Sequence, residues 1–285
     1  MKRLAITAIA LLLVNSFITA QQNRQDSKEY DAVKATALNY GDGWYSGSSE
    51  RMESALHPEL NKVSVIKFGA EGKPVLQHST VSGLVEMAGG KRGMLDEDKR
   101  KESVDVYDID GNIACAKLNS AQFNDYLVLV KFSNGWKIVN VLWNPGPDAQ
   151  QKPVVADFTP GSEKDAIINA AKDFTEGILN CDIAQFGKSS HSELNLVQVA
   201  GLPSSERNFL TKIGPGMLME LLNAKMIRVP ENMRSSESKI LDSSDGYAFV
   251  KSVSPSITFY LQMAKIGGNW ITVNALLNPG QSRGK

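Results

Sequence analysis

The sequence has little of what a disulfide scaffold or a nucleic-acid binder needs. It contains two cysteines in 285 residues, and its 31 basic residues are balanced by 31 acidic ones. A balanced chain lacks the broad positive field that attracts nucleic acid, so we expect no nucleic-acid partner. Cys115 lies in an apolar, strand-like run, and Cys181 follows a helix-like run in the other half of the chain. We therefore expect two unpaired thiols and no disulfide.

Motifs of familiar catalytic sites are also missing. The chain has no His-Glu-x-x-His, no pair of Cys-x-x-Cys, no Gly-rich phosphate loop and no Gly-x-Ser-x-Gly. These absences argue against a metalloenzyme, a nucleotide hydrolase and an α/β-hydrolase. We expect no metal and no cofactor. Only three histidines are available for acid–base chemistry.

A long apolar run occurs only at the N-terminus. Lys2 and Arg3 precede the apolar residues 4–14, and the small Ala20 precedes a polar segment. The run is too short for a membrane-spanning helix, which needs about 20 residues. We predict a signal peptide over residues 1–20, with an uncleaved anchor as the alternative. The mature chain then begins near Gln21, is periplasmic or secreted, has no integral membrane association and carries a charge of 29 − 31 = −2.

The sequence contains an internal repeat. A shift of 134 residues aligns residues 31–146 with 165–280 without a gap, and 30 of the 116 positions are identical. Chance would give about 6% identity at ordinary composition. The identities cluster where 57–63 faces 191–197 and where 136–146 faces 270–280. We predict two domains of one fold, at 24–148 and 163–281, joined by a polar, Pro-containing linker at 149–162.

Each copy places helices before strands. Helical spacing of apolar residues predicts helices over 31–45, 50–56 and 81–88, and over 163–179 in the second copy. Alternation and β-branched residues predict strands over 62–68, 102–108, 112–118, 123–132 and 136–143. Four dipeptides are typical of type I′ hairpin turns: Asp110-Gly111, Asn134-Gly135, Asp245-Gly246 and Gly267-Gly268. The order predicts α+β domains, each with a mostly antiparallel sheet.

The late strands are apolar on both faces. In the segment 123–132, Leu127 and Leu129 lie on one face, while Tyr126, Val128 and Val130 lie on the other. A sheet with one solvated face would alternate apolar and polar residues. One face is therefore expected to pack on the helices and the other on the sheet of the second repeat. We predict an intrachain pseudo-dimer.

Several segments of the first copy resemble the putative lumazine-binding family of the NTF2-like superfamily. They are residues 40–45, 55–60, 125–131 and 136–143, and the second copy follows through the repeat. The resemblance implies two cystatin-like cone domains, in which N-terminal helices and a curved, mostly antiparallel sheet enclose a cavity. Some relatives catalyse isomerase, dehydratase or cyclase reactions in such a cavity, and others only bind a molecule there. Dimerisation through the sheet is common among them.

Both copies depart from the family pattern, the second copy at more positions. The terminal strand of the family often has a His two residues after its Tyr, but Val128 and Gln262 stand there. Ile178 and Leu277 replace Trp44 and Trp143. Pocket chemistry that needs these groups is therefore least expected in the second copy.

His57 and His191 occupy the same position in the two copies. Each could act as a general base, because histidine titrates near neutral pH. Each could instead close the second helix by bonding a backbone carbonyl. Asp125 has no acidic counterpart in the second copy and could pair with His57 in the manner of NTF2-like enzymes.

Other polar residues interrupt apolar strands. Asn140 and Asn274 need hydrogen-bond partners, which a ligand or a neighbouring backbone could supply. Asp108 and Asp242 are expected to cap turns, and Trp136 and Trp270 to anchor packing. The ligand-binding candidates are Tyr40, Trp44, His57, Tyr126, Asn140, Trp143, His191, Tyr260 and Asn274.

The preferred function is an exported tandem protein that binds a small, partly apolar molecule or serves as an assembly module, without catalysis. The alternative is an enzyme of the isomerase, dehydratase or cyclase type, in which His57 acts as base with Asp125 or Tyr126 as its partner. A third alternative is a purely structural, partner-binding protein, which an exposed apolar patch would support.

Overall fold

The computed structural model describes residues 26–69, 71–150, 161–201 and 207–279. The predicted signal peptide and residues 151–160 of the predicted linker lie outside these ranges. The first domain contains a helix over residues 26–46, then α2 (Ser49–Ala55), β1 (Leu56–Lys67), β2 (Pro74–Ser79), α3 (Val81–Gly89), the 3-10 helix η1 (Glu97–Lys99), β3 (Ser103–Asp110), β4 (Ile113–Asn119), β5 (Asn124–Phe132) and β6 (Gly135–Trp143). The second contains α4 (Lys164–Asn180), α5 (Ile183–Gly187), β7 (Ser190–Gly201), β8 (Asn208–Ile213), α6 (Pro215–Asn223), η2 (Glu231–Met233), β9 (Glu237–Ser244), β10 (Tyr247–Val253), β11 (Ile257–Ile266) and β12 (Asn269–Pro279).

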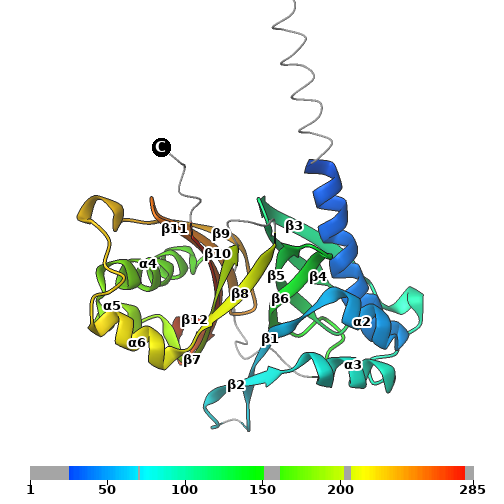
Figure 1. Ribbon diagram of the computed structural model, residues 1–285. Coiled ribbons are helices and arrows are strands. Elements are labelled where there is room, and N and C mark those ends of the chain that lie inside the picture. The colour runs from blue at the N-terminus through cyan, green and yellow to red at the C-terminus, as the bar shows by residue number, and fades with distance from the viewer. Residues whose placement is uncertain (1–25, 70, 151–160, 202–206, 280–285) are drawn as a thin grey trace, which may run out of the picture.

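Each domain builds one six-stranded sheet (Figure 1). The strand orders are β2-β1-β6-β5-β4-β3 and β8-β7-β12-β11-β10-β9, which are the same topology. The pairs β1–β6 and β7–β12 are parallel, and the remaining neighbours are antiparallel. The predicted α+β class and the predicted repetition of one fold are confirmed.

The first strand of each sheet is longer than the sequence indicated. β1 begins at Leu56 and runs through His57 and Pro58, although a strand was expected only from Lys62. A β-bulge between Leu56 and Asn61 interrupts the pairing of β1 with β6. The bulge accommodates a proline, which has no N–H for the ladder. The edge strands β2 and β8 were not predicted, because each is only six residues long and half polar.

The hairpin turns differ between the two copies. In the second copy Asp245 and Gly246 both have positive φ, as a type I′ turn requires, and so do Gly267 and Gly268. In the first copy only the glycine of each dipeptide does, at 61° for Gly111 and 104° for Gly135. The type I′ expectation is therefore wrong for the first copy, where one left-handed residue suffices to reverse the chain.

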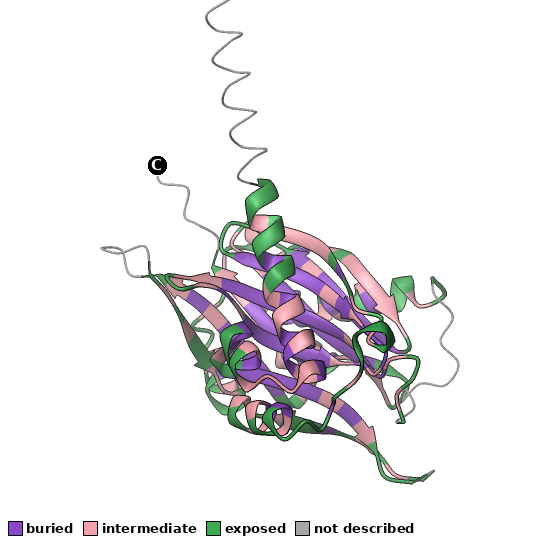
Figure 2. Cartoon of the chain, turned by 90° about the vertical axis from the view of Figure 1, so that its right-hand side faces the viewer, coloured by how far each residue is buried: buried purple, intermediate pink, exposed green. Residues whose placement is uncertain are grey.

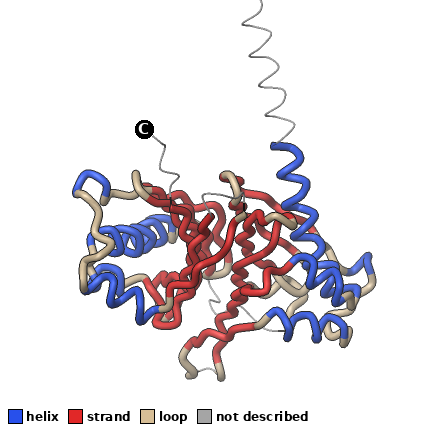
Figure 3. Tube along the Cα trace, viewed as in Figure 1, coloured by secondary structure: helices blue, strands red, loops and turns tan. Residues whose placement is uncertain are grey.

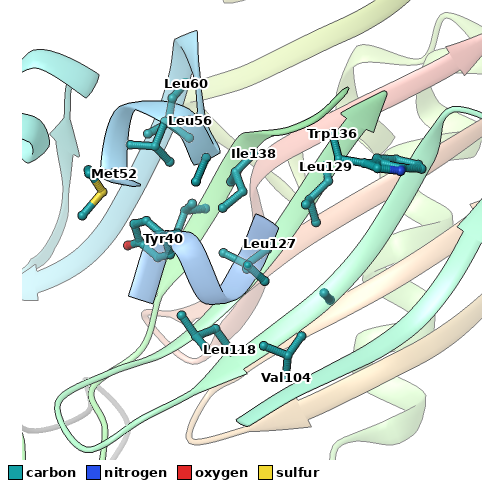
Figure 4. Packing of buried hydrophobic residues seen from close by; sticks show 14 of the residues in the cluster. Tyr40, Met52, Leu56, Leu60, Val104, Leu118, Leu127, Leu129, Trp136 and Ile138 are labelled. Carbon is teal, nitrogen blue, oxygen red and sulfur yellow. The ribbon is translucent and has the colours of Figure 1, made fainter. Parts of the chain in front are cut away.

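Helices cover the outer face of each sheet, and the two sheets face each other in the middle of the molecule (Figures 1 and 3). The buried face of the first sheet and its helices form one core, in which Tyr40 packs among aliphatic side chains (Figure 4). The outer side of the helix over residues 26–46 is exposed, most fully over residues 26–32 (Figure 2). A corresponding core lies between α4–α6 and the second sheet.

A third core joins the two domains. It contains Val128 and Val130 from the first sheet, Phe249 and Tyr260 from the second, and the free thiol of Cys115. Both faces of each sheet are therefore buried, which accounts for strands that are apolar on both faces. Burial raises the pKa of the Cys115 thiol well above its usual value.

One anchoring contact recurs in both domains at the start of the first helix. Glu29 accepts hydrogen bonds from the Lys131 ammonium at 2.7 Å and the Trp136 indole N–H at 2.8 Å. Glu163 accepts the same bonds from Lys265 at 2.6 Å and Trp270 at 3.0 Å. The tryptophans thus hold the last hairpin of each domain to its first helix. Within the part of the chain that the structure describes, no helix is both long and apolar enough to cross a membrane.

Candidate functional site

A cleft of about 900 Å³ lies beside His57, at the junction of the two domains. The first domain supplies the start of β1, the start of α3 and the β5–β6 turn, and the second supplies the start of β8. We call it the His57 cleft. Its walls are Glu53, Leu56, His57, Pro58, Thr80, Val81, Ser82, Val85, Glu86, Phe132, Ser133, Asn134, Lys137, Arg207 and Asn208.

His57 is held in one tautomer by the bulge that carries it. The backbone N–H of Glu59 donates to His57 Nδ1 at 3.2 Å, so in the neutral ring the proton sits on Nε2. The imidazole stacks on Phe132, with ring centroids 4.5 Å apart. Burial lowers the pKa of His57. At neutral pH the cleft therefore presents a fixed N–H donor beside an aromatic wall.

His191 lies in an equivalent β-bulge, but two residues that line the His57 cleft are not repeated near it. The backbone N–H of Glu193 donates to His191 Nδ1 at 3.1 Å, and burial again lowers the histidine pKa. Both histidines thus accept a bond from an amide two residues on, rather than closing a helix as expected. The residues equivalent to Phe132 and Lys137, however, are Ile266 and Ile271.

A second group of polar residues lies inside the first domain. The Tyr40 hydroxyl donates to Asp125 Oδ2 at 2.7 Å. The Lys62 ammonium donates to the same Oδ2 at 2.7 Å and to the Tyr40 oxygen at 2.5 Å. Phe123 covers this group, with its ring centroid 5.4 Å from the Lys62 nitrogen. We call Tyr40, Lys62 and Asp125 the interior triad.

Burial dominates the electrostatics of the interior triad. It raises the pKa of Asp125 although Lys62 opposes this, and it lowers the pKa of Lys62 although Asp125 opposes this. Burial, together with the nearby Asp125, raises the pKa of Tyr40 well above its usual value. Asp125 Oδ1 is buried without a hydrogen bond of ordinary geometry, and the backbone N–H of Asn144 favours the ionised carboxylate only weakly.

The second domain replaces the interior triad with apolar side chains. Phe174, Leu196 and Phe259 stand at the positions of Tyr40, Lys62 and Asp125. Phe174 and Phe259 pack edge to face, with centroids 5.5 Å apart. The same fold therefore forms without these polar groups.

The structure does not bring His57 and Asp125 together. Leu56, next to His57, pairs with Ile138, whose partner on β5 is Leu129. Leu129 lies four residues from Asp125, or about 13 Å along the strand. Asp125 instead pairs with Lys62, which the sequence did not single out because it resembled an ordinary solvent-facing residue of a strand.

Two of the tyrosines expected to bind a ligand, Tyr126 and Tyr260, instead donate their hydroxyl hydrogen bonds to aspartates of the opposite domain. Tyr126 donates to Asp242 at 2.8 Å, and Lys117 approaches the same oxygen at 2.7 Å. In the mirrored arrangement Tyr260 and Lys251 both donate to Asp108, at 3.1 and 2.7 Å. Burial alone would raise the pKa of Asp242, but Lys117 and Tyr126 outweigh it and hold the pKa below its usual value. The two aspartates thus join the domains rather than merely capping turns.

The two asparagines face the same interface. Asn61 donates to Asn274 at 2.7 Å, and Asn195 donates to Asn140 at 3.1 Å. Asn274 also donates to Gln262 at 2.8 Å, and Gln262 donates to the carbonyl of Tyr126 at 2.7 Å. The opposite domain therefore supplies a partner to each asparagine that a ligand or a neighbouring backbone was expected to supply, while Asn140 Nδ2 and Asn195 Oδ1 are buried without one.

The remaining sequence candidates lie at the margin of the first core. Trp44 donates to Gln122 at 3.3 Å, and Trp143 packs against the core while half-buried. Cys115 and Cys181 are free thiols. Among the described residues, no group of His, Cys, Asp and Glu could hold a metal ion.

Solved structures similar to this chain each match the length of one domain. An NTF2-like protein of unknown function from Silicibacter pomeroyi is 17% identical, covers 42% of this chain and 98% of its own, and has a TM-score of 0.35. A cystatin-like protein of unknown function from Nostoc punctiforme is 17% identical, with 45% and 97% covered and a TM-score of 0.34. A ketosteroid isomerase-like protein from Erwinia carotovora atroseptica is 18% identical, with 42% and 98% covered and a TM-score of 0.33.

No curated protein matches the chain. One family model does, over residues 28–144, and its description is putative lumazine-binding. The match spans the first domain from the helix over residues 26–46 to the end of β6. The resemblance predicted from the motifs around Tyr40, His57 and Trp136 is confirmed: the first domain carries the pattern of the putative lumazine-binding family.

Proposed function

We propose that this chain is an exported protein that binds a small, partly apolar ligand in the His57 cleft, without catalysis. The observation that carries the proposal is the cleft itself. Its volume, about 900 Å³, lies in the range of small-molecule sites, and both domains contribute to its walls.

The lining of the cleft suits a planar molecule with polar edges. Pro58, Val81, Val85 and Phe132 supply apolar surface, and His57 Nε2 supplies a fixed donor. Glu53 and Glu86 offer acceptors on the helical side. A flat heterocycle with donors and acceptors on its rim fits this arrangement, and the family description suggests lumazine as the first compound to test.

Two observations favour binding over the alternative enzyme. His57 is far from Asp125, and the Tyr126 hydroxyl is bonded to Asp242 in the interface. Neither partner proposed for a His57 base is within its reach. Since a general base must contact the proton that it removes, a catalytic pair would need groups brought by the ligand.

A matched pair of variants tests the proposal. His57→Ala and His191→Ala remove the same backbone hydrogen bond from equivalent bulges, so each should lower the unfolding free energy by about 1 kcal/mol. Fluorescence titration with lumazine and a panel of planar heterocycles should show binding that His57→Ala weakens about tenfold, or 1.4 kcal/mol, and that His191→Ala leaves unchanged. Equal affinities for the two variants would place the ligand elsewhere.

Export is tested separately. Intact-mass measurement of the protein recovered outside the cytoplasm should give a chain that begins at Gln21. Retention of residues 1–20 in that fraction would overturn the predicted cleavage and favour an anchor.

A further inference from the structure

The binding role assigned to the His57 cleft leaves the interior triad unused. Tyr40 and Asp125 are buried, and Lys62 is only 7% exposed. None of the three lines the His57 cleft. The triad is also confined to one domain, because the equivalent residues of the second domain are Phe174, Leu196 and Phe259.

Folding alone does not account for the interior triad. Burying a lysine and a carboxylate removes both charges from water, and the gain from pairing them often fails to exceed that loss. Apolar residues of similar volume fill the same place in the second domain without a charge. A polar cluster that the fold can replace points to a chemical role.

The geometry favours movement of a proton within the triad. Lys62 and Asp125 Oδ2 are 2.7 Å apart, and the Tyr40 hydroxyl contacts both. Burial lowers the pKa of Lys62 and raises that of Asp125, so transfer of a proton from the ammonium to the carboxylate is less costly than in water. The product of that transfer is a neutral amine beside a carboxylic acid and a phenol.

We propose that Lys62 captures the carbonyl group of a small aldehyde or ketone as an imine inside the first domain. The neutral amine adds to the carbonyl carbon, and the carbonyl oxygen takes a proton from Asp125 to give a carbinolamine. The nitrogen then returns a proton to the carboxylate while the hydroxyl group takes a proton from Tyr40 and leaves as water. The remaining N–H proton restores the phenol, so the net reaction is amine plus carbonyl to imine plus water.

Two features of the site suit the carbinolamine. Asp125 Oδ1 is buried and lacks an ordinary hydrogen bond, so it can accept one from the new hydroxyl. The rings of Tyr40 and Phe123 have their centroids 5.2 and 5.4 Å from the Lys62 nitrogen and help to limit access of water. Because all three side chains are buried, we restrict the proposal to small carbonyl compounds.

The test uses the full chain and needs no variant in its first step. The protein is incubated at pH 7 with glycolaldehyde or with propionaldehyde, reduced with sodium borohydride, and digested for peptide mass spectrometry. Borohydride supplies the hydride that converts the imine to a stable secondary amine. Labelling of Lys62 should exceed that of the exposed Lys67 and Lys91 about tenfold, because burial lowers the pKa of Lys62 and enlarges its neutral fraction.

Variants then separate reactivity from burial. Asp125→Asn keeps Lys62 but removes the acid that protonates the carbonyl oxygen. It should reduce Lys62 labelling at least to the level of the exposed lysines, although losing the carboxylate lowers the pKa of Lys62 further. Lys188→Arg, an exposed change in the second domain, should leave Lys62 labelling unaltered. Wild-type labelling of Lys62 that is no greater than that of Lys67 and Lys91 would show a structural ion pair only, whatever the variants do. Binding in the His57 cleft would stand in either case.

Discussion

At the residue scale, Glu102 is in an environment that disfavours its charge. It is half-buried, its Oε1 has no hydrogen-bond partner, and it lies beside the carboxylate of Asp42. Burial first, and Asp42 second, raise the pKa of Glu102 from 4.5 to about 7. The second domain has Ser236 at this position, bonded to Glu176, and avoids the conflict.

The raised pKa of Glu102 predicts that the free energy of unfolding depends on pH. Because its pKa is higher in the folded state, the folded protein binds more protons between pH 4.5 and about 7, and stability falls as the pH rises through that window. Urea unfolding should show wild type losing stability between pH 5 and pH 8 relative to Glu102→Gln, which mimics the protonated acid. The exposed control Glu97→Gln should follow wild type. Parallel curves for wild type and Glu102→Gln would refute the prediction.

The interior triad makes a second residue-scale prediction, on stability. Lys62→Leu leaves Asp125 buried without its cation and should cost about 3–5 kcal/mol. The triple variant Tyr40→Phe, Lys62→Leu, Asp125→Phe copies the second domain and should recover most of that loss. Urea unfolding of the two variants measures the difference. A triple variant less stable than Lys62→Leu would show that the core of the first domain cannot accommodate the three apolar residues of the second domain.

At the element scale, each domain closes by docking its last hairpin on its first helix. Glu29 and Glu163 do this through the same lysine and tryptophan contacts, although most other positions of the two helices differ in sequence. In the first domain the contact ties the helix that carries Tyr40 to the β5–β6 hairpin. In the second domain the negative charge of Glu163, the N-cap of α4, also suits the helix dipole.

This contact predicts a local effect in the second domain. Glu163→Gln weakens the bonds to Lys265 and Trp270 and should lower the unfolding free energy by about 1 kcal/mol. Hydrogen exchange should accelerate in the β11–β12 turn and the first turn of α4, but not in β9 or β10. Uniform acceleration across the domain would show that the contact supports the whole fold instead.

At the scale of the whole molecule, the interface is nearly, but not fully, symmetric. Lys251 is held by two carboxylates, Asp108 at 2.7 Å and Asp110 at 3.1 Å. In the mirrored site Lys117 has Asp242 at 2.7 Å, and Ser244 stands where Asp110 would be. Gln262 likewise joins the amide network from one side, because its equivalent is Val128.

The asymmetry predicts unequal costs for equivalent changes. Asp242→Asn deprives Lys117 and Tyr126 of their shared carboxylate, whereas Asp108→Asn leaves Asp110 with Lys251 and Tyr260. Asp242→Asn should therefore be the more destabilising by about 1 kcal/mol. Denaturant unfolding of the two variants decides this, and equal losses would show that Asp110 does not compensate.

Much of the architecture could be predicted from local patterns in the sequence. The repeat, the helices and the central strands followed from apolar spacing and turn residues, because these features report on neighbours within a few positions. The sequence also located His57 and Asp125 as unusual. It missed Lys62, since nothing adjacent distinguishes a lysine inside a cone from one on a surface.

The sequence by itself determined that one α+β fold occurs twice and that its strands bury both faces. Only the tertiary structure decided which polar residues meet. It assigned Tyr126, Tyr260, Asn140 and Asn274 to the contact between domains, separated His57 from Asp125, and paired Asp125 with Lys62. The reason is physical: periodicity records the face on which a side chain lies, but a hydrogen bond depends on the register and curvature of strands that are distant in the chain.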